Sequence, residues 1–378
     1  MPLFAILMIG NMKELKVISF SLSPPFLFLF LLLMWAGVSI FWAVTPIPAL
    51  KTFASLCITF IFSFLFLSLI QKATPEVMSR AYLILTISGL ILGFLILAQV
   101  MADSFQVGLI KKYAGEPFMM KPTGSILGLL GFVGCAFLWI NNHKILSILT
   151  YFLFILLIYL TLCQTALYAL LIGSCIFVLS YTAPFWTTRV ALIFSYTFLI
   201  LSPVLSVYVF TPPQLSQVPL AGQVLGRSFY HRVLAWEFYS MKFFEKPFLG
   251  WGVESARYLP SDQQLAEGFS NVIHPHNNAV QIYAELGLIG GILFALFFAS
   301  LFRLVEQNVK DRLSIAVCNA TIVFAFIEAE ITHNVWRNYW LSLVTLVTGL
   351  IFLFLKVREG QLRGAVGHSK PVLAPEMV

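Results

Sequence analysis

The chain alternates between long apolar segments and short polar connections. Ten segments are predominantly apolar over roughly 20 residues, the length that a helix needs to cross a bilayer. They are 25–44, 50–70, 80–101, 124–141, 145–163, 165–182, 188–210, 279–302, 313–332 and 337–355. The pattern predicts an all-α polytopic membrane protein with a single membrane domain over 1–378. It also predicts one large loop at about 211–278 and a disordered polar tail over 357–378.

Composition supports the same fold class. Hydrophobic residues make up 60% of the 378 positions and charged residues only 10%. Soluble domains have about 45–50% and about 25%. A water-soluble domain could not bury so much apolar surface, so lipid is the expected solvent. The formal net charge of +7 then reflects membrane topology and does not indicate nucleic acid.

Basic residues predict the orientation of the bundle. With the N-terminus inside, 13 of the 23 Lys and Arg residues fall in inside segments, mostly very short loops. Basic residues gather in cytoplasmic loops of membrane proteins. We therefore expect both termini in the cytoplasm and the loop at 211–278 on the outer face.

The stretch "NVIHPHNNAVQIYAELGLIGG", residues 271–291, gathers polar groups where this loop enters an apolar segment. His274 and His276 could be ordinary hydrogen-bonded groups, or metal ligands together with His231. No carboxylate or Cys is adjacent in sequence, which argues against a metal. A third interpretation is a general base, because imidazole titrates near neutral pH. Asn277 or Asn278 could then fix the ring or hold an acceptor.

The apolar segment that follows contains three glycines and one acidic residue that are also candidates. Gly287, Gly290 and Gly291 leave one side of the helix thin and permit close helix packing. Glu285 lies about two turns inside the apolar segment. An acidic residue at that depth is a candidate for substrate contact, and a structural hydrogen-bonding role is equally open.

The large loop contains a second group of candidates. "SFYHRVLAWEFYSMKFFEK" lacks Gly and Pro and predicts a buried or interfacial helix ended by Pro247. Gly250 and Gly252 give the following turn backbone freedom. Lipid headgroups explain Arg227 adequately. Arg232 lies near a helix start, where anions are favoured, and its guanidinium suits phosphate, so ligand contact and lipid contact stay open.

The chain has no phosphate-binding P-loop and no Gly-x-Gly-x-x-Gly. The outer face of a membrane also lacks cytosolic nucleotides. Any chemistry at the histidines must therefore use a substrate that arrives already activated.

Two motifs resemble the O-antigen ligase family of bacterial inner-membrane glycosyltransferases. One family motif is His, then Asn, Ser or Gln, nine residues, Gly, two residues, and Gly, Thr or Tyr. It falls on His276, Asn277, Gly287 and Gly290. The other is an Arg-x-x-x-Trp helix followed by Pro-x-x-Gly-x-Gly, and it matches Arg232, Trp236, Pro247, Gly250 and Gly252.

The resemblance implies a fold of the lipid-dependent glycosyltransferase kind, with its active site facing the periplasm. Members transfer a glycan from undecaprenyl pyrophosphate to an acceptor such as lipid A–core, without metal or cofactor. By resemblance, Arg232 holds the pyrophosphate and His276 activates the acceptor hydroxyl. The candidates for further substrate contacts are Asn277, Arg227, Lys121, Gln164, His274 and Glu285.

Two family motifs are altered in this chain. Members often carry Thr-Leu-Ser-Arg-Gly between two spans, where this chain has Thr-Leu-Cys-Gln-Thr and Gln164 replaces the Arg. Members also have Gly-Thr-Phe-x-Asn-Pro-Asn where this chain has Gly-Ser-Ile-Leu-Gly from Gly124. Lys121, just before that segment, could supply a cation.

Two other functions stay open at this point. An O-antigen polymerase uses the same donor but extends another lipid-linked glycan. A transporter or flippase could use Glu285, Glu328 and Glu330 along its path, although no inverted repeat is visible.

Overall fold

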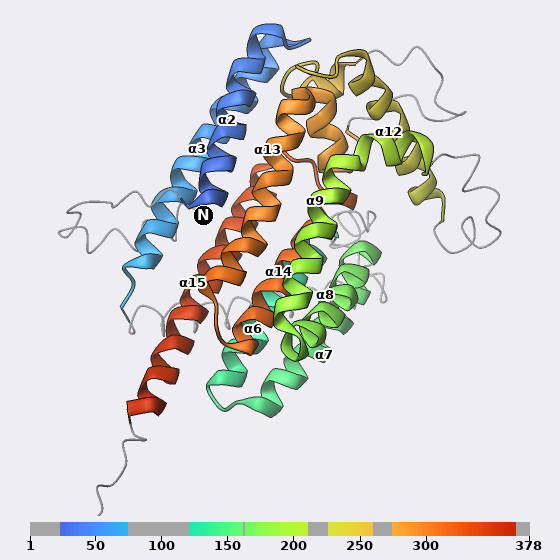
Figure 1. Ribbon diagram of the computed structural model, residues 1–378. Helices are drawn as coiled ribbons and strands as arrows, with labels where there is room; N and C mark the ends of the chain where they lie inside the picture. Colours follow the sequence, from blue (N-terminus) through green and yellow to red (C-terminus); the bar gives the residue numbers. More distant parts are fainter. Residues whose placement is uncertain (1–22, 75–120, 162, 211–225, 260–273, 368–378) are drawn as a thin grey trace, which may run out of the picture.

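The computed structural model describes residues 23–74, 121–161, 163–210, 226–259 and 274–367. Every regular element within these residues is a helix (Figure 1). They are α2 (Pro24–Val38), η2 (Ser39–Trp42), α3 (Pro46–Gln71), α6 (Lys121–Ile140), α7 (Lys144–Leu160), α8 (Gln164–Thr182), α9 (Pro184–Tyr208), α12 (Gly226–Glu245), η4 (Ser255–Tyr258), α13 (Asn278–Asn308), α14 (Arg312–Ile331) and α15 (Asn338–Gly367).

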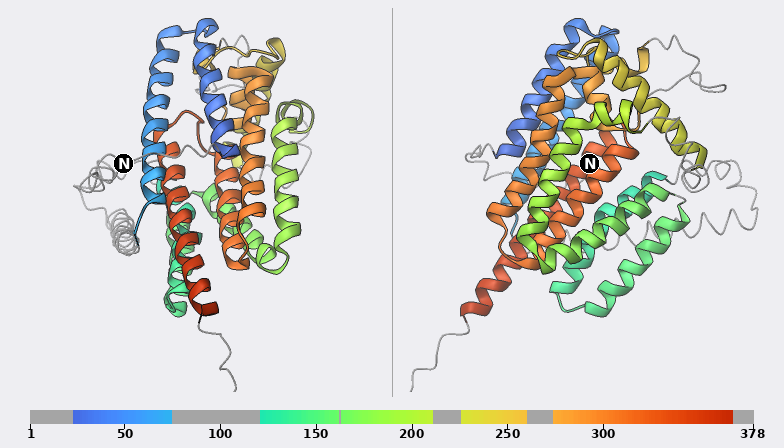
Figure 2. Two further views of the ribbon diagram at one scale, coloured as in Figure 1. Left: turned by 60° about the vertical axis from the view of Figure 1, so that its left-hand side comes forward. Right: turned by 45° about the vertical axis from the view of Figure 1, so that its right-hand side comes forward.

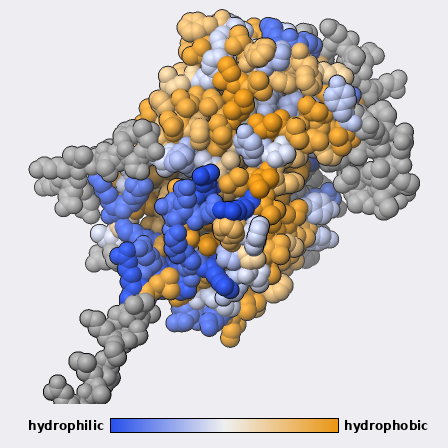
Figure 3. All heavy atoms as spheres, viewed as in Figure 1, coloured by the Kyte–Doolittle hydropathy of each residue, from blue (hydrophilic) through white to orange (hydrophobic). Residues whose placement is uncertain are grey.

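The all-α polytopic fold is confirmed. Eight helices among the described residues are long and apolar enough to cross a membrane, and α7 is a shorter apolar helix. Each predicted span coincides with one of these helices except 80–101, which lies outside the described residues. Hydrophobic residues cover much of the face in Figure 3, and hydrophilic ones gather toward the end where α15 finishes.

Buried hydrogen bonds between polar side chains join neighbouring spans. Asn319 on α14 donates through Nδ2 to Ser180 Oγ on α8 at 3.1 Å and to Thr188 Oγ1 on α9 at 2.7 Å. Helix α13 lies against both α2 and α9, and α14 lies against α8 (Figures 1 and 2). These contacts make α13 and α14 the centre of the bundle.

The polar stretch 357–367, expected to be disordered, is helical and continues α15. Lys356 Nζ donates to the carbonyls of Gln71 at 3.1 Å and Ala73 at 2.9 Å, at the end of α3. Arg358 pairs with Asp311 at 3.2 Å. These side chains order the helix because they cap or pair with neighbouring elements. Residues 368–378 lie outside the described part.

Helix α12 confirms the helix predicted in the large loop, and it ends at Glu245, just before Pro247. It packs against α9 and α13 at the end of the bundle where α13 begins (Figure 1). The loop therefore brings Arg232 and Trp236 to the same end as the histidines.

Candidate functional site

The two histidines lie in residues 274–277, directly before α13, and we call this segment the histidine loop. Trp236 Nε1 on α12 donates to the carbonyl of Pro275, between the histidines, at 2.8 Å. Asn277 caps α13, its Oδ1 accepting from Val280 N at 2.8 Å. The side chain predicted to contact substrate therefore also has a structural task.

His276 adopts a left-handed backbone conformation, with φ of 54°. That region costs a residue with a side chain on the order of 1–2 kcal/mol, so the contacts around it must hold it there. Its Nδ1 lies 3.1 Å from the carbonyl oxygen of Thr332, at the end of α14. Because a carbonyl can only accept, Nδ1 carries the hydrogen and the neutral ring keeps its lone pair on Nε2.

His274 lies against His276, with ring centroids 4.0 Å apart. Burial lowers the pKa of His274 to about 3, and the positive fields of His276, Arg337, Arg257 and His333 act in the same direction. His274 is therefore neutral at physiological pH, and it is surrounded by groups that carry or can take positive charge.

Arg232 is half-buried, and within the described residues its guanidinium makes no hydrogen bond or ion pair. Burial lowers the pKa of Arg232, while electrostatic interaction with Cys163 and Glu328 opposes that shift. Because α12 begins at Gly226, Arg232 is almost two turns inside the helix, and the predicted position at the helix start is not observed.

Cys163, which acts electrostatically on Arg232, lies in the connection from α7 to α8. Gln164, which stands where the resemblance implied an Arg, is the first residue of α8 and is exposed. The structure thus brings together two segments that the sequence could link only by resemblance.

A buried polar cluster includes Glu328, the carboxylate that acts electrostatically on Arg232. The sequence did not indicate this cluster. Ser125 Oγ on α6 donates to Glu328 Oε2 on α14. His333 Nε2 lies 3.2 Å from Ser125 Oγ and 3.3 Å from Glu328 Oε2, and its Nδ1 lies 2.9 Å from Tyr339 OH. The available signal was the group of polar residues around the junction of two apolar segments, which includes Glu328 and His333.

The glycine motifs form one close backbone contact. Gly287 interrupts α13 with φ of 65° and ψ of −163°, a conformation that is essentially restricted to glycine. A Cβ there would lie 2.3 Å from the carbonyl oxygen of Phe248. The turn after α12 supplies the hydrogen bonds across this break, from Trp251 N to Ala284 O, Gly252 N to Glu285 O and Leu288 N to Pro247 O. Gly287 is thus a break in the helix and not a thin face.

Gly290 and Gly291 lie against side chains that precede the break at Gly287. A Cβ on Gly290 would lie 2.3 Å from Leu286 Cβ, and one on Gly291 would lie 2.2 Å from the Tyr283 ring. Both glycines therefore accommodate the change of direction at the break.

Glu285 is fully buried, and its carboxylate accepts four hydrogen bonds. The donors are Glu254 N at 2.8 Å, Ala256 N at 3.1 Å, Gln281 Nε2 at 3.1 Å and Trp336 Nε1 at 2.5 Å. This arrangement favours the structural role over substrate contact, because the oxygens already bind groups from three elements.

Two further candidates are placed only by their backbones. Lys121 is the first residue of α6 and Arg227 the second residue of α12. Their side chains lie outside the described part. No group of three or more His, Cys, Asp or Glu that could hold a metal ion occurs among the residues described.

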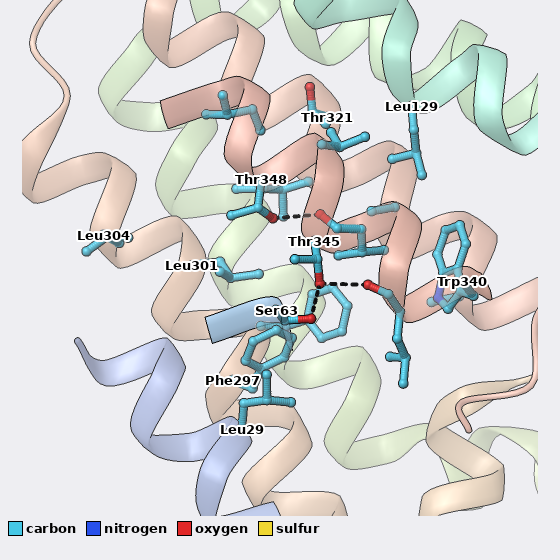
Figure 4. A pocket seen from close by; sticks show the side chains of 18 of the residues that line it. Leu29, Ser63, Leu129, Phe297, Leu301, Leu304, Thr321, Trp340, Thr345 and Thr348 are labelled. Atoms are coloured by element: carbon cyan, nitrogen blue, oxygen red, sulfur yellow. Dashed lines mark hydrogen bonds between the residues drawn. The ribbon is translucent and has the colours of Figure 1, made fainter. Parts of the chain in front are cut away.

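An apolar groove of about 440 Å³ is lined by residues of α2, α3, α13, α14 and α15 (Figure 4). It extends from Asn278 and Trp336, at the histidine end, to Asn308 and Leu355. Its hydroxyl groups are satisfied locally, for example between Thr345 and Ser63 at 2.9 Å. The ring of Trp340, which lines the groove, stacks on His333 with centroids 4.0 Å apart.

A second cavity, a polar cleft of about 430 Å³, lies at the same end. Its walls come from the start of α3, the loop that carries η4 and the connection from α14 to α15. They include Lys51, Glu254, Arg257, Arg337 and Tyr339. From the sequence, the basic residues of this cleft had indicated only membrane topology.

Comparison with known proteins confirms the resemblance inferred from the two motifs. A family model described as "O-Antigen ligase" matches residues 149–295, which include Arg232 and His276. Three relatives carry the name "Putative polysaccharide ligase". The one from Rickettsia prowazekii is 27% identical over 318 residues, which are 81% of this chain and 75% of the relative. Those from Rickettsia conorii and Rickettsia felis are each 28% identical, over 85% of this chain and 78% of the relative. No solved structure matches the chain.

Proposed function

We propose that this chain, which matches the O-antigen ligase family model over residues 149–295, moves a glycan from undecaprenyl pyrophosphate to lipid A–core at the periplasmic face of the bacterial inner membrane. One observation carries the proposal. Trp236 and Pro275 join the helix of Arg232 to the loop of His276 by a 2.8 Å hydrogen bond. A cation without a hydrogen-bonding partner in the described residues thus lies on an element tied directly to a candidate base.

The chemistry assigns a role to each group. The acceptor hydroxyl oxygen forms a bond to the anomeric carbon of the donor sugar, and the bond from that carbon to the pyrophosphate oxygen breaks. The hydroxyl proton goes to His276 Nε2, the nitrogen that keeps its lone pair when Nδ1 donates to Thr332. Undecaprenyl pyrophosphate leaves with the negative charge, which the Arg232 guanidinium stabilises through two parallel hydrogen bonds.

The surroundings support these roles. Electrostatic interaction with Glu328 opposes the effect of burial on the Arg232 guanidinium. The apolar groove offers an isoprenoid chain a path along the spans that ends at Trp336 and Trp340. Asn277 and Glu285 hold the loop and the turn around the base.

Deletion of the gene, followed by lipopolysaccharide gels, tests the reaction class. A ligase deletion loses the whole ladder and retains the core. Core with a single repeat would identify a polymerase instead, and an unchanged pattern would overturn the proposal for either activity.

The variant His276→Ala tests the base in the purified chain, with lipid-linked donor and lipid A–core. Transfer should fall by about 10²–10⁴, the usual contribution of general base catalysis, while donor binding is kept. His143→Ala is the control, because His143 is exposed in the connection between α6 and α7. Full transfer by His276→Ala would rule out the base.

A further inference from the structure

The polar cleft carries an excess of positive charge. Lys51, Arg257 and Arg337 line it with a single carboxylate, Glu254. Arg257 Nε pairs with Glu254 Oε1 at 2.9 Å, so two of the three cations are left over. Among the residues that the structure describes, neither Lys51 nor Arg337 makes a hydrogen bond or ion pair through its side chain.

These two cations come from different elements and face one space. Lys51 is on the first turns of α3, and Arg337 is in the connection that precedes α15. Both are exposed. Two cations that face one space favour an anion between them, and a sugar phosphate carries nearly two negative charges at neutral pH.

The cleft is separate from the place of Arg232, which does not line it. Tyr339 stands between them, because it lines the cleft while its hydroxyl meets His333 Nδ1 at 2.9 Å. His333 in turn lies 3.3 Å from Glu328, the carboxylate that interacts with Arg232. The cleft and Arg232 are therefore two separate positive regions, and Tyr339 and His333 lie between them.

The histidine loop is close to both places. Arg337 and Arg257 act electrostatically on His274, whose ring centroid is 4.0 Å from that of His276. A saccharide anchored in the cleft by its charge would thus have neighbouring hydroxyls within reach of the histidine loop. The half-buried Arg232 suits the lipid-linked donor, and the open cleft suits a hydrated glycan.

We propose that this cleft binds a phosphate group on the acceptor glycan, through Lys51 and Arg337. The proposal rests on the proposed function, since it assigns the second substrate of the same transfer. It makes the acceptor a phosphorylated saccharide, and it makes these two residues determinants of acceptor specificity, with no part in the chemical step.

The double variant Lys51→Gln, Arg337→Gln tests the cleft, and it disturbs no hydrogen bond or ion pair of these side chains in the described structure. The full chain, in nanodiscs of neutral lipid, would be titrated with a phosphorylated acceptor glycolipid, with the phosphatase-treated form and with lipid-linked donor. We expect the unaltered chain to prefer the phosphorylated form. The double variant should bind that form at least tenfold more weakly, and should bind donor within twofold of normal.

A matched control has the same change of charge at the opposite end of the bundle. Lys310→Gln, Arg363→Gln replaces two exposed basic residues there and should leave both affinities unchanged. In transfer assays the cleft variant should raise KM for the acceptor and leave kcat near normal, because the base and Arg232 are intact.

Three outcomes would overturn the assignment. Weakened donor binding by the cleft variant would mean that the cleft holds the donor pyrophosphate. Equal competition by phosphatidylglycerol vesicles would identify a lipid headgroup. Equal affinity of the unaltered chain for both acceptor forms would show that phosphate is not recognised. If only the cleft proposal fails, the chain still transfers glycan, at equal rates to the phosphorylated and dephosphorylated acceptors. If the proposed ligase function fails, neither acceptor receives glycan.

Discussion

Trp236 Nε1 donates a 2.8 Å hydrogen bond to the carbonyl oxygen of Pro275, and this bond joins α12 to the histidine loop. Arg232 lies one turn before Trp236 on the same helix, and His276 follows Pro275 directly. The Trp236 indole therefore links the helix of the proposed donor cation to the loop of the proposed base, in addition to the packing of α12 against α13.

Trp236→Phe tests this dependence. Phe keeps the aromatic packing but leaves the Pro275 carbonyl without this donor, at a cost of about 1–3 kcal/mol when such a group is buried. We expect about a tenfold loss of transfer with normal membrane insertion, measured as product formed by purified protein. Trp186→Phe is the control, because Trp186 is 69% exposed on α9. Equal activity of both variants would show that the indole only packs.

The spans could be predicted from sequence because their signal is local. Segments of about 20 apolar residues, such as 165–182 and 188–210, are sufficient to identify helices in lipid. The end of α15 was misjudged for the opposite reason. Its polar residues are ordered by Gln71, Ala73 and Asp311, and contacts so distant in sequence leave no local pattern.

The site could be predicted only where a motif is compact. His276, Asn277 and Gly287 fall in one run, and the structure gives each a distinct geometry. The cluster of Ser125, Glu328 and His333 joins residues about 200 positions apart in sequence, so no spacing could reveal it. The break at Gly287 was likewise hidden, because a glycine in an apolar run is also typical of simple helix packing.

Arg232→Lys tests whether geometry or charge matters at the proposed pyrophosphate site. Lys keeps the positive charge but cannot form two parallel hydrogen bonds to phosphate oxygens. Losing one charge-assisted hydrogen bond costs about 1.5–3 kcal/mol, so transfer should fall by roughly 10- to 100-fold. Arg227→Ala, on the first turn of the same helix, should lose less. Near-normal transfer by Arg232→Lys would reduce Arg232 to an interfacial anchor.

The pKa of His274, lowered to about 3 by burial and by nearby positive groups, predicts a pH-dependent stability. The ordinary His pKa is about 6.5, so below that pH the unfolded chain binds a proton that the folded chain resists. Stability should therefore fall as pH drops from about 6.5 toward 3, with no contribution from His274 above 6.5.

His274→Asn removes this titration. The melting temperature of the detergent-solubilised variant should fall less between pH 7 and pH 5 than that of the unaltered chain. His143→Asn replaces an exposed histidine and should behave like the unaltered chain. If His274→Asn loses as much stability as the unaltered chain, His274 is not held neutral by its surroundings.

Gly287→Ala tests the break in α13. The new Cβ would lie 2.3 Å from the Phe248 carbonyl oxygen and 2.7 Å from Gly250 N, both backbone atoms that cannot rotate away. The positive φ of 65° adds strain of about 1–2 kcal/mol. The turn after α12 should then separate from α13, and the histidine loop should lose its support. We expect a melting temperature lowered by several degrees and transfer reduced more than tenfold.

Gly360→Ala is the control, because a Cβ there meets nothing within 4 Å in α15. That change should leave transfer unaltered and stabilise the helix by up to about 1 kcal/mol, since Ala favours helix over Gly. Normal melting and transfer in Gly287→Ala would mean that α13 can pass through this point as a regular helix.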